Sequence, residues 1–251
     1  MSLPRILVAS PTSIDKDYCF DGWADMVRGF DYPRYSVVMV DNSPKKHNYY
    51  RKIQEKGFNA GWVDRSGKLA EQYLCESQEA IRHYFLKSGY DYLLMLESDV
   101  FVPKDTLSYM AMHREAVYNM TYFVNLERNN FETSLCLQVK MNRNGNMRTR
   151  MVTPEESAAL SGRKGMMMDM KIGDASVSQS GIGCTMIAKE VAAMIPFRWV
   201  NEYKNPMGEV VRNKYFSDTL FHLDVNNKGI RNVLDTTRIC EHRRSSGWTY
   251  N

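Results

Sequence analysis

The 251-residue sequence lacks the features that mark a secreted, membrane-spanning or metal-thiolate protein. Its five cysteines lie far apart, and none pairs with another at the short spacing of a zinc site. An odd number of cysteines also fits no closed disulfide framework, so reduced thiols are the better interpretation. No apolar run approaches the roughly 18 residues of a membrane span, and the N-terminus has no signal-peptide pattern. The sequence therefore predicts a cytoplasmic protein without a transmembrane segment.

Charge of either sign is also in little excess. Lys plus Arg total 33 and Asp plus Glu total 29, which gives a formal net charge of +4 at pH 7. This excess permits an anionic ligand but is too small to indicate nucleic-acid binding by itself. Hydrophobic residues make up 43 % of the chain, which is enough for a packed core and argues against intrinsic disorder. We find no internal repeat and no linker between domains.

The first 103 residues alternate between apolar strand patterns and helix patterns. Cys19, Trp23, Val27 and Phe30 recur at intervals of four, four and three residues, as one face of a helix requires. We expect strands at residues 5–13, 35–44, 60–65 and 92–96, and helices at residues 19–30, 43–58 and 68–87. This alternation predicts an α/β fold with a mostly parallel sheet.

Three of the expected strands end in polar residues. These ends are Ser10-Pro11-Thr12, Asp41-Asn42-Ser43 and Glu97-Ser98-Asp99. In a parallel sheet, ligands bind at the carboxyl ends of the strands. One polar strand end arises easily by chance, whereas three on one edge indicate a binding site.

The third of these ends carries two carboxylates with one residue between them. Glu97 and Asp99 follow the most apolar strand of the chain and point to the same side of an extended segment. Two carboxylates held close together repel each other unless a cation lies between them, so a divalent metal ion is a natural occupant. The alternative is an ordinary acidic turn at the end of a strand, and the spacing alone does not separate the two.

The second half of the chain is less regular. Strands are expected at residues 121–127 and 134–141. They are followed by a glycine turn, strand and short helix over residues 180–197, a helix at 217–229 capped by Ser217, and a last strand ending at His242. Residues 140–170 are polar, basic and rich in glycine and methionine, and we expect a flexible loop there. Its cations include Arg143, Arg148, Arg150, Arg163 and Lys164. Such a loop is a donor lid, an acceptor-binding arm, or a solvated excursion whose methionines pack on the core.

The order of these motifs resembles that of the GT-A fold glycosyltransferases, the nucleotide-diphospho-sugar transferases, and in particular their family 2. "YDYLLMLESDVFVP" is similar to the DxD motif, "GIGCTMIAKEVAAMIPF" to the strand and helix of the acceptor side, and "YFSDTLFHLDVNNKGIRNVLDTTRICEHR" to the late helix and terminal histidine. The resemblance covers roughly residues 5–243. It implies a single GT-A domain over residues 1–251, an open α/β sandwich with a Rossmann-like nucleotide-binding half at 1–103 and a smaller acceptor half at 104–251.

Carried over by position, the resemblance implies a role for each site residue. Asp99 is the direct ligand of a divalent ion, Mn²⁺ or Mg²⁺, and Glu97 and His242 complete the metal site. Asp218 takes the position of the general base in inverting members. The residues on the side of the donor, a nucleotide-diphosphate sugar, are Pro11, Thr12, Asp41, Arg65, Glu97 and Ser98. The implied reaction is transfer of the sugar to an acceptor hydroxyl with inversion at the anomeric carbon.

Two positions depart from the family's usual pattern. The triplet begins with Glu97 instead of aspartate, and the acidic pair that opens the late helix is here Ser217-Asp218, with one carboxylate. Each assignment also has a structural alternative. Asp41 can be a turn residue, Asp218 a charge that stabilises the helix N-terminus, and His242 a surface histidine.

The acceptor and the function class leave alternatives open. We expect a glycan or glycoconjugate acceptor, ahead of a modified nucleic acid, because the net charge is small and no nucleic-acid-binding motif is present. A nucleotidyltransferase also uses an acid-x-acid metal site, but it requires a glycine-rich phosphate loop that "ASPTSIDKD" lacks. A non-catalytic module that binds nucleotide sugars or glycans would carry the same residues.

Overall fold

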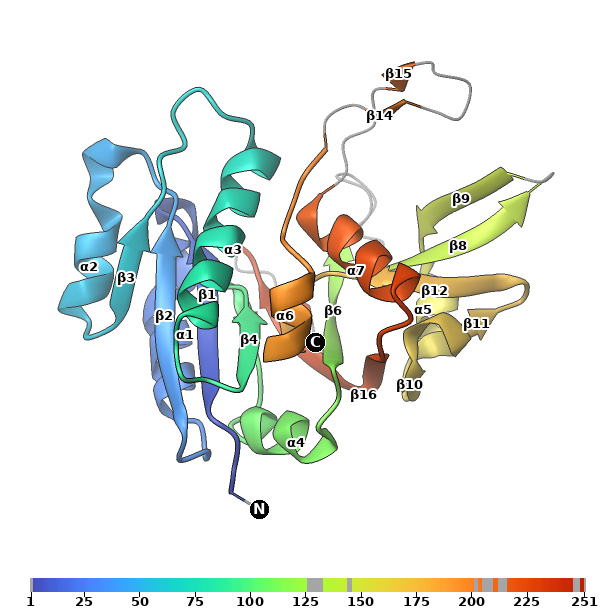
Figure 1. Ribbon diagram of the computed structural model, residues 1–251, viewed down its shortest axis with the longest axis horizontal. Helices are drawn as coiled ribbons and strands as arrows, with labels where there is room; N and C mark the ends of the chain where they lie inside the picture. The colour runs from blue at the N-terminus through green and yellow to red at the C-terminus, as the bar shows by residue number, and fades with distance from the viewer. Residues whose placement is uncertain are drawn as a thin grey trace.

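The computed structural model describes residues 2–125, 133–143, 146–200, 203–204, 210–211, 216–245 and 249–250. A large mixed sheet runs through the molecule with helices on both faces (Figure 1). Its strands, in spatial order, are β10 (Lys164–Met166), β16 (Asn232–Arg243), β6 (Val117–Asn125), β13 (Cys184–Ala188), β4 (Tyr92–Leu96), β1 (Ile6–Thr12), β2 (Tyr35–Asp41) and β3 (Asn59–Trp62). The short strands β5 (Val100–Phe101) and β17 (Thr249–Tyr250) pair with β16, and β7 (Thr133–Leu135) pairs with β6. The predicted α/β fold is therefore confirmed.

Strand β1 shows how the sheet separates two hydrophobic cores. Ile6 and Val8 point into one core, while Leu7 and Ala9 point into the other, as the period of two along a strand requires. The first core is covered by α1 (Asp17–Arg28), α2 (Tyr49–Glu55) and α4 (Thr106–His113). The second is covered by α3 (Ala70–Leu86), α6 (Lys189–Met194) and α7 (Ser217–Asn227), which lie toward the viewer in Figure 1. The described residues contain no helix with the length and apolar character to cross a bilayer.

The helix predicted over residues 43–58 is divided in the structure. A short 3₁₀ turn, η2 (Lys45–His47), is followed by Asn48 with a φ of 48° and then by α2. A residue in the left-handed region cannot continue a right-handed helix, so the two pieces stay separate. A similar 3₁₀ turn, η1 (Ile14–Lys16), follows β1 and precedes α1.

The segment expected to be a long loop, residues 140–170, is largely regular in its described part. Strands β8 (Leu137–Arg143) and β9 (Asn146–Met151) form a second sheet with β12 (Ala175–Ser180) and β11 (Lys171–Ile172). Helix α5 (Pro154–Leu160) begins with a capping box between Thr153 and Glu156, a start signal that the composition of the segment obscured. The turn η3 (Met167–Asp169) follows β10 and buries Met167.

A third hydrophobic core explains why this segment folds. Leu137 and Val139 of β8 alternate toward it, and Leu160, Met167 and Met170 pack there too. Two methionines of the segment therefore pack on a core, as one of the three interpretations of residues 140–170 proposed. Residues 144–145 lie outside the described part of the chain, as does the side chain of Arg143.

Two further predictions are corrected. The single strand expected at residues 134–141 is two strands, β7 and β8, because the chain leaves the large sheet at Cys136 and enters the small one. Ser217 does not cap α7, since Phe216 is the N-cap residue and the Ser217 hydroxyl donates to Gln78 Oε1 on α3. Residues 126–127 of the strand expected at 121–127 lie outside the described part. A short pair, β14 (Tyr203–Lys204) and β15 (Val210–Val211), completes the described strands.

Candidate functional site

The three polar strand ends lie side by side at the carboxyl ends of the adjacent parallel strands β2, β1 and β4. Strand β1 lies between β2 and β4 and is parallel to both, and Thr12 pairs in register with Asp41. The Thr12 hydroxyl donates to Ser98 Oγ at 2.9 Å, and Asn42 N donates to the Thr12 carbonyl at 2.8 Å. The adjacency predicted for these ends is therefore confirmed, although their roles toward a nucleotide stay predictions.

Helix α1 holds the backbone of the acidic triplet in place. The Trp23 indole N–H donates to the Glu97 carbonyl at 3.0 Å, and the Cys19 thiol donates to the Ser98 carbonyl at 3.2 Å. Both side chains belong to the apolar stripe that the sequence predicts for this helix. The polar atoms of these two side chains therefore also bind the backbone of the acidic triplet, which the periodicity of the helix alone does not reveal.

A candidate metal centre lies at the carboxyl end of β4, next to the C-terminal part of β16. Ligand atoms of Glu97, Asp99 and His242 all lie within 4.8 Å of one another. The short strand β5 pairs antiparallel with β16 and places Val100 opposite His242. Arg243 N donates to the Asp99 carbonyl at 2.9 Å, and His242 Nε2 lies 3.2 Å from Asp99 Oδ2. The structure thus unites three residues that the resemblance assigned to one metal site.

The donor set fits a hard divalent cation. Asp99 is 1 % exposed and its Oδ1 has no hydrogen-bond partner among the described residues, which is a costly arrangement for a buried carboxylate oxygen. His242 Nδ1 is also buried without a partner in that part of the chain. Two carboxylates and one imidazole match the ligand preferences of Mn²⁺, and the carboxylates match those of Mg²⁺.

Lys16, which the sequence analysis did not single out, lies against this centre. Its ammonium group contacts Asp99 Oδ2 from the end of η1. Burial alone would lower the pKa of Lys16, but the charge of Asp99 outweighs it and the pKa is raised. A cavity of about 450 Å³ opens at this point, lined by Asp15, Lys16, Tyr18, Asp99, His242, Arg244 and Ser245.

The two carboxylates of the centre have opposite pKa shifts. Burial, together with the negative charge of Asp99, raises the pKa of Glu97 to about 7. Burial would also raise the pKa of Asp99, but the hydrogen bond with His242 and the charge of Lys16 outweigh it, so this pKa is lowered. Asp99 is therefore the carboxylate that stays charged, which agrees with its assignment as the direct ligand.

Tyr122 on β6 is the second site residue that sequence reasoning missed. Its hydroxyl lies 3.5 Å from Glu97 Oε2, and its ring centroid lies 5.0 Å from that of His242. A Cβ on Gly183 would come within 2.4 Å of Tyr122 Cε1, and one on Gly181 within 2.4 Å of its hydroxyl oxygen. The G-x-G of the acceptor-side motif was the available signal, because glycines permit such a close approach.

Asp218 lies at the start of α7, half-buried and outside the metal centre. Thr219 N donates to its Oδ1 at 2.6 Å. Burial raises the pKa of Asp218, although this hydrogen bond opposes the shift. Its charge is one of those that raise the pKa of Glu97, which places the two carboxylates in one electrostatic environment. Whether Asp218 acts as a base stays a prediction.

Four of the predicted donor-side residues, Pro11, Thr12, Asp41 and Ser98, are buried in the structure. Asp41 is fully buried, and its two carboxylate oxygens accept from Ser43 N and Tyr50 N, each at 2.8 Å. This is the turn role that the sequence offered as the alternative, and it fixes the strand end and the first turn of α2. Arg65 pairs with Asp15 at 3.1 Å, next to the mouth of the metal centre. Pro11 is buried within β1.

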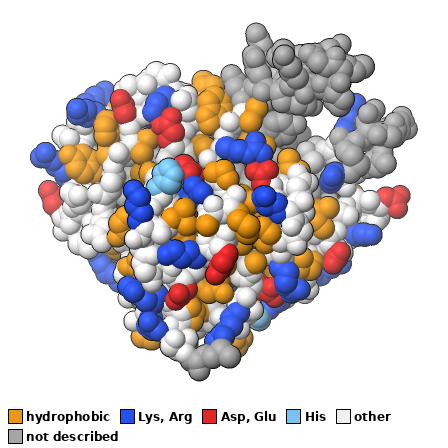
Figure 2. All heavy atoms as spheres, in the orientation of Figure 1, with side chains coloured by type: hydrophobic (Ala, Val, Ile, Leu, Met, Phe, Trp, Pro, Cys, Tyr) orange, Lys and Arg blue, Asp and Glu red, His pale blue; other side chains and the backbone are white. Residues whose placement is uncertain are grey.

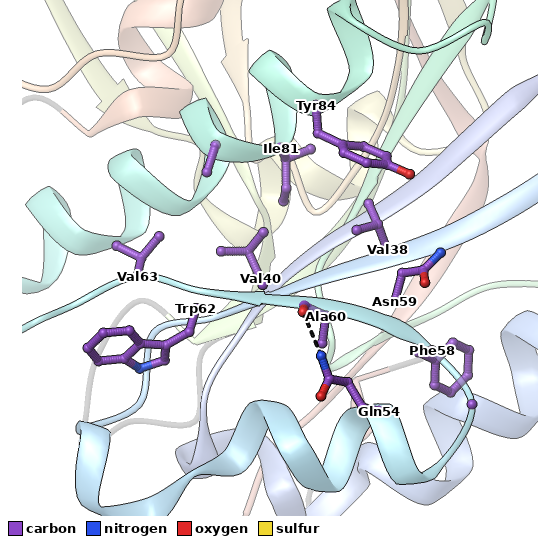
Figure 3. Close-up of a pocket in the computed structure, with 13 residues that line it drawn as sticks. Val38, Val40, Gln54, Phe58, Asn59, Ala60, Trp62, Val63, Ile81 and Tyr84 are labelled. Carbon is purple, nitrogen blue, oxygen red and sulfur yellow. Dashed lines mark hydrogen bonds between the residues drawn. The ribbon is translucent and has the colours of Figure 1, made fainter.

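A separate cavity of about 760 Å³ lies at the outer edge of the large sheet, beside β3 (Figure 3). Ile81 and Tyr84 of α3 face Val38 and Val40 of β2 across it. It is lined by Val38, Val40, Gln54, Gly57, Phe58, Asn59, Ala60, Gly61, Trp62, Val63, Ala80, Ile81 and Tyr84. None of the predicted site residues lines it, so it is not part of the candidate site.

Comparison with known proteins bears on the fold. No family model matches the chain, and no curated protein matches its sequence. Among solved structures, S. aureus TarS is similar at 13 % identity and a TM-score of 0.52, over 94 % of this chain and 36 % of that one. TarS 1-349 in complex with UDP-GlcNAc is similar at 12 % identity and a TM-score of 0.50, over 94 % and 57 %.

The mannosyltransferase PcManGT from Pyrobaculum calidifontis, in complex with GDP-Man and Mn²⁺, is similar at 12 % identity and a TM-score of 0.53. That match covers 99 % of this chain and 59 % of the other, so the chain spans roughly a third to three fifths of the length of these structures. The chain has the fold of the nucleotide-sugar glycosyltransferases, the GT-A fold, as the sequence resemblance implied. At these identities the likeness establishes the fold and leaves the activity to the site.

Proposed function

We propose that this protein is a glycosyltransferase that depends on a divalent metal ion and moves a sugar from a nucleotide-diphosphate sugar to an acceptor hydroxyl. The observation that carries the proposal is the convergence of Glu97, Asp99 and His242 at the carboxyl edge of a GT-A sheet. In open α/β folds this edge is where nucleotides bind. The pairing of β5 with β16 brings the C-terminal histidine to the acidic triplet and completes the centre.

Asp99 and His242 would hold the ion directly, and Glu97 would bind it or one of its water molecules. A bound divalent ion supplies positive charge to the departing diphosphate, which requires no proton transfer. Lys16 is placed to add a second positive charge at the same mouth once it leaves Asp99. The resemblance implies contacts of Thr12, Ser98 and Arg65 with the nucleotide. In support, Thr12 donates to Ser98 next to Asp99, and Arg65 pairs with Asp15, which lines the mouth.

Asp218 would act on the acceptor. In the proposed reaction the bond between the anomeric carbon and the diphosphate oxygen breaks, and its electron pair leaves with the nucleotide diphosphate. The acceptor oxygen forms the new bond to the anomeric carbon, and its proton passes to the Asp218 carboxylate. The raised pKa of Asp218 makes it a better base than an exposed aspartate. Attack from the side opposite the leaving group gives inversion.

A screen of nucleotide sugars with and without Mn²⁺, read by thermal unfolding, tests this proposal. A ligand that binds only the folded protein adds about 2.7 kcal/mol of stability at a hundredfold excess over its Kd. We expect at least one nucleotide sugar to raise the Tm further with Mn²⁺ than without it, and its nucleotide diphosphate to be released slowly by hydrolysis. Binding without any release would instead indicate a non-catalytic module. No stabilisation by any nucleotide sugar would contradict the proposal.

A further inference from the structure

A second cleft lies on the acceptor half, between α7 and the small sheet, with a volume of about 810 Å³. It is lined by Lys140, Arg148, Thr149, Met168, Ser178, Gln179, Arg198, Val200, Thr219, Leu220, Leu223, Asn226 and Asn227. We propose that this cleft is the acceptor subsite and that it binds an acidic glycan, a chain that carries both anionic groups and hydroxyls. This inference rests on the proposed function.

The position of the cleft suits an acceptor. Thr219 and Leu220, which line it, directly follow Asp218 in the first turn of α7. An acceptor bound there would present a hydroxyl near the proposed base, while the rest of the glycan extends along the helix toward Asn226. The apolar side chains of Leu220 and Leu223 supply a surface for the C–H face of a sugar ring.

The charge of the cleft is locally positive. Arg198 is neutralised by Asp224, with two N–O distances of 2.8 and 2.9 Å. Lys140 and Arg148 have no ion-pair partner in the described part of the chain. Lys140 pairs in register with Thr149 across β8 and β9, so both point to the face of the small sheet that borders the cleft. Arg148, the residue before Thr149, also lines the cleft. Two cations that line one cleft and have no ion-pair partner among the described residues favour carboxylate, sulfate or phosphate groups.

The cleft also offers hydrogen bonds to hydroxyls. A β-bulge between Val177 and Gln179 interrupts the pairing of β12 with β8. Consecutive residues of a regular strand point to opposite faces, but the bulge lets both Ser178 and Gln179 line the cleft. Gln179 is only 5 % exposed, and its Oε1 has no partner among the described residues. A buried amide without a partner is a costly feature that a ligand hydroxyl would satisfy.

Three further cations of residues 140–170, Arg150, Arg163 and Lys164, do not line this subsite. Arg150 forms two hydrogen bonds with Glu156, both of 2.6 Å. Arg163 donates to the Lys171 carbonyl at 3.2 Å, and Lys164 lies over aromatic rings of the large sheet and α4. The face seen in Figure 2 likewise shows Lys and Arg interspersed with Asp and Glu. This pattern favours a local site for an acidic glycan over an extended surface for nucleic acid.

The test compares the double variant Lys140→Ser/Arg148→Ser with a charge-matched control, Lys87→Ser/Lys104→Ser, whose lysines are exposed and do not line the cleft. The probes are hexasaccharides of oligogalacturonate and chondroitin sulfate, each beside a neutral counterpart, carboxyl-reduced or desulfated, and a single-stranded oligonucleotide. Binding is measured by calorimetry without donor at several salt concentrations. Binding of a nucleotide sugar with Mn²⁺ is measured in parallel.

We expect wild type and the control to bind an acidic hexasaccharide more tightly than its neutral counterpart. The cleft variant should lose roughly tenfold or more of that affinity, show a flatter salt dependence and retain donor binding. The inference is overturned if the cleft variant loses no affinity, if neutral probes bind as well as acidic ones, or if only the oligonucleotide binds. Glycan binding that depends on the cleft, without any donor binding, would instead count against the proposed function alone.

Discussion

Acidification from pH 7 to pH 5 should destabilise the protein through His222, the buried histidine of α7. This side chain is 0 % exposed, and Asn232 Nδ2 lies 3.3 Å from its Nδ1. Burial lowers the pKa of His222 to about 3. In the unfolded chain a histidine titrates near 6.5. Between these two values the unfolded state binds a proton that the folded state does not, so unfolding becomes more favourable as the pH falls.

The size of the effect follows from the same two pKa values. At pH 5 the unfolded state gains RT ln(1 + 10^1.5), which is about 2 kcal/mol, from protonation of this histidine, and at pH 7 it gains only about 0.2 kcal/mol. The stability that neutral His222 contributes is fully present above the unfolded pKa. It is lost at about 1.4 kcal/mol per pH unit as the pH falls from 6.5 toward 3. For a protein of ordinary stability this is a substantial share of the unfolding free energy.

Urea unfolding at pH 7 and pH 5 measures this effect in wild type, His222→Leu and His47→Leu. His47 is exposed on η2 and serves as the matched control. The loss of unfolding free energy on acidification should be about 2 kcal/mol smaller for His222→Leu than for the other two proteins. The comparison uses each protein's own pH difference, so a change in its absolute stability does not obscure the result. An equal loss in all three proteins would refute the reasoning.

Three further predictions concern the site. Asp218→Asn should leave donor affinity near wild type and lower turnover by roughly 10² or more, and NMR of the product should show inversion, since retention would remove its proposed role. Gly183→Ala should cost about 1–3 kcal/mol of unfolding free energy and weaken Mn²⁺ binding, because its Cβ would displace Tyr122, which contacts Glu97 and His242. Gly61→Ala, whose Cβ would meet nothing within 4 Å, is the control, and equal effects would contradict this account. His242→Ala should weaken calorimetric Mn²⁺ binding less than loss of Asp99 does, and unchanged binding would remove it from the site.

Much of the fold could be predicted from the sequence because the residue patterns that indicate its strands and helices are local. Ile6 to Ala9 and Leu93 to Leu96 are apolar on both faces, as strands covered by helices on each side must be. Asp99 and His242 were recognised by their place in an ordered series of motifs. Their contact could not be derived from spacing, because it depends on the antiparallel pairing of β5 with β16.

The parts that escaped prediction depend on tertiary contacts or on signals masked by composition. Tyr122 lies in an expected strand, but its contacts with Glu97 and His242 depend on Gly181 and Gly183, which pack against it from a distant part of the sequence. Lys16 is the last residue of an ordinary 3₁₀ turn, and its proximity to Asp99 becomes visible only when β1 and β4 are placed side by side. The start signal of α5 at Thr153 was present, yet the surrounding basic residues led us to expect a loop.

Calorimetric titration of a stabilising nucleotide sugar, with and without Mn²⁺, into wild type, Asp99→Asn and Asp25→Asn tests the central claim most directly. Asp25 is 81 % exposed on α1 and controls for the change of charge. We expect Mn²⁺ to strengthen donor binding to wild type and Asp25→Asn, and Asp99→Asn to lose this strengthening while it still unfolds cooperatively. Donor binding to Asp99→Asn that responds to Mn²⁺ as in wild type would contradict the assignment of the metal centre.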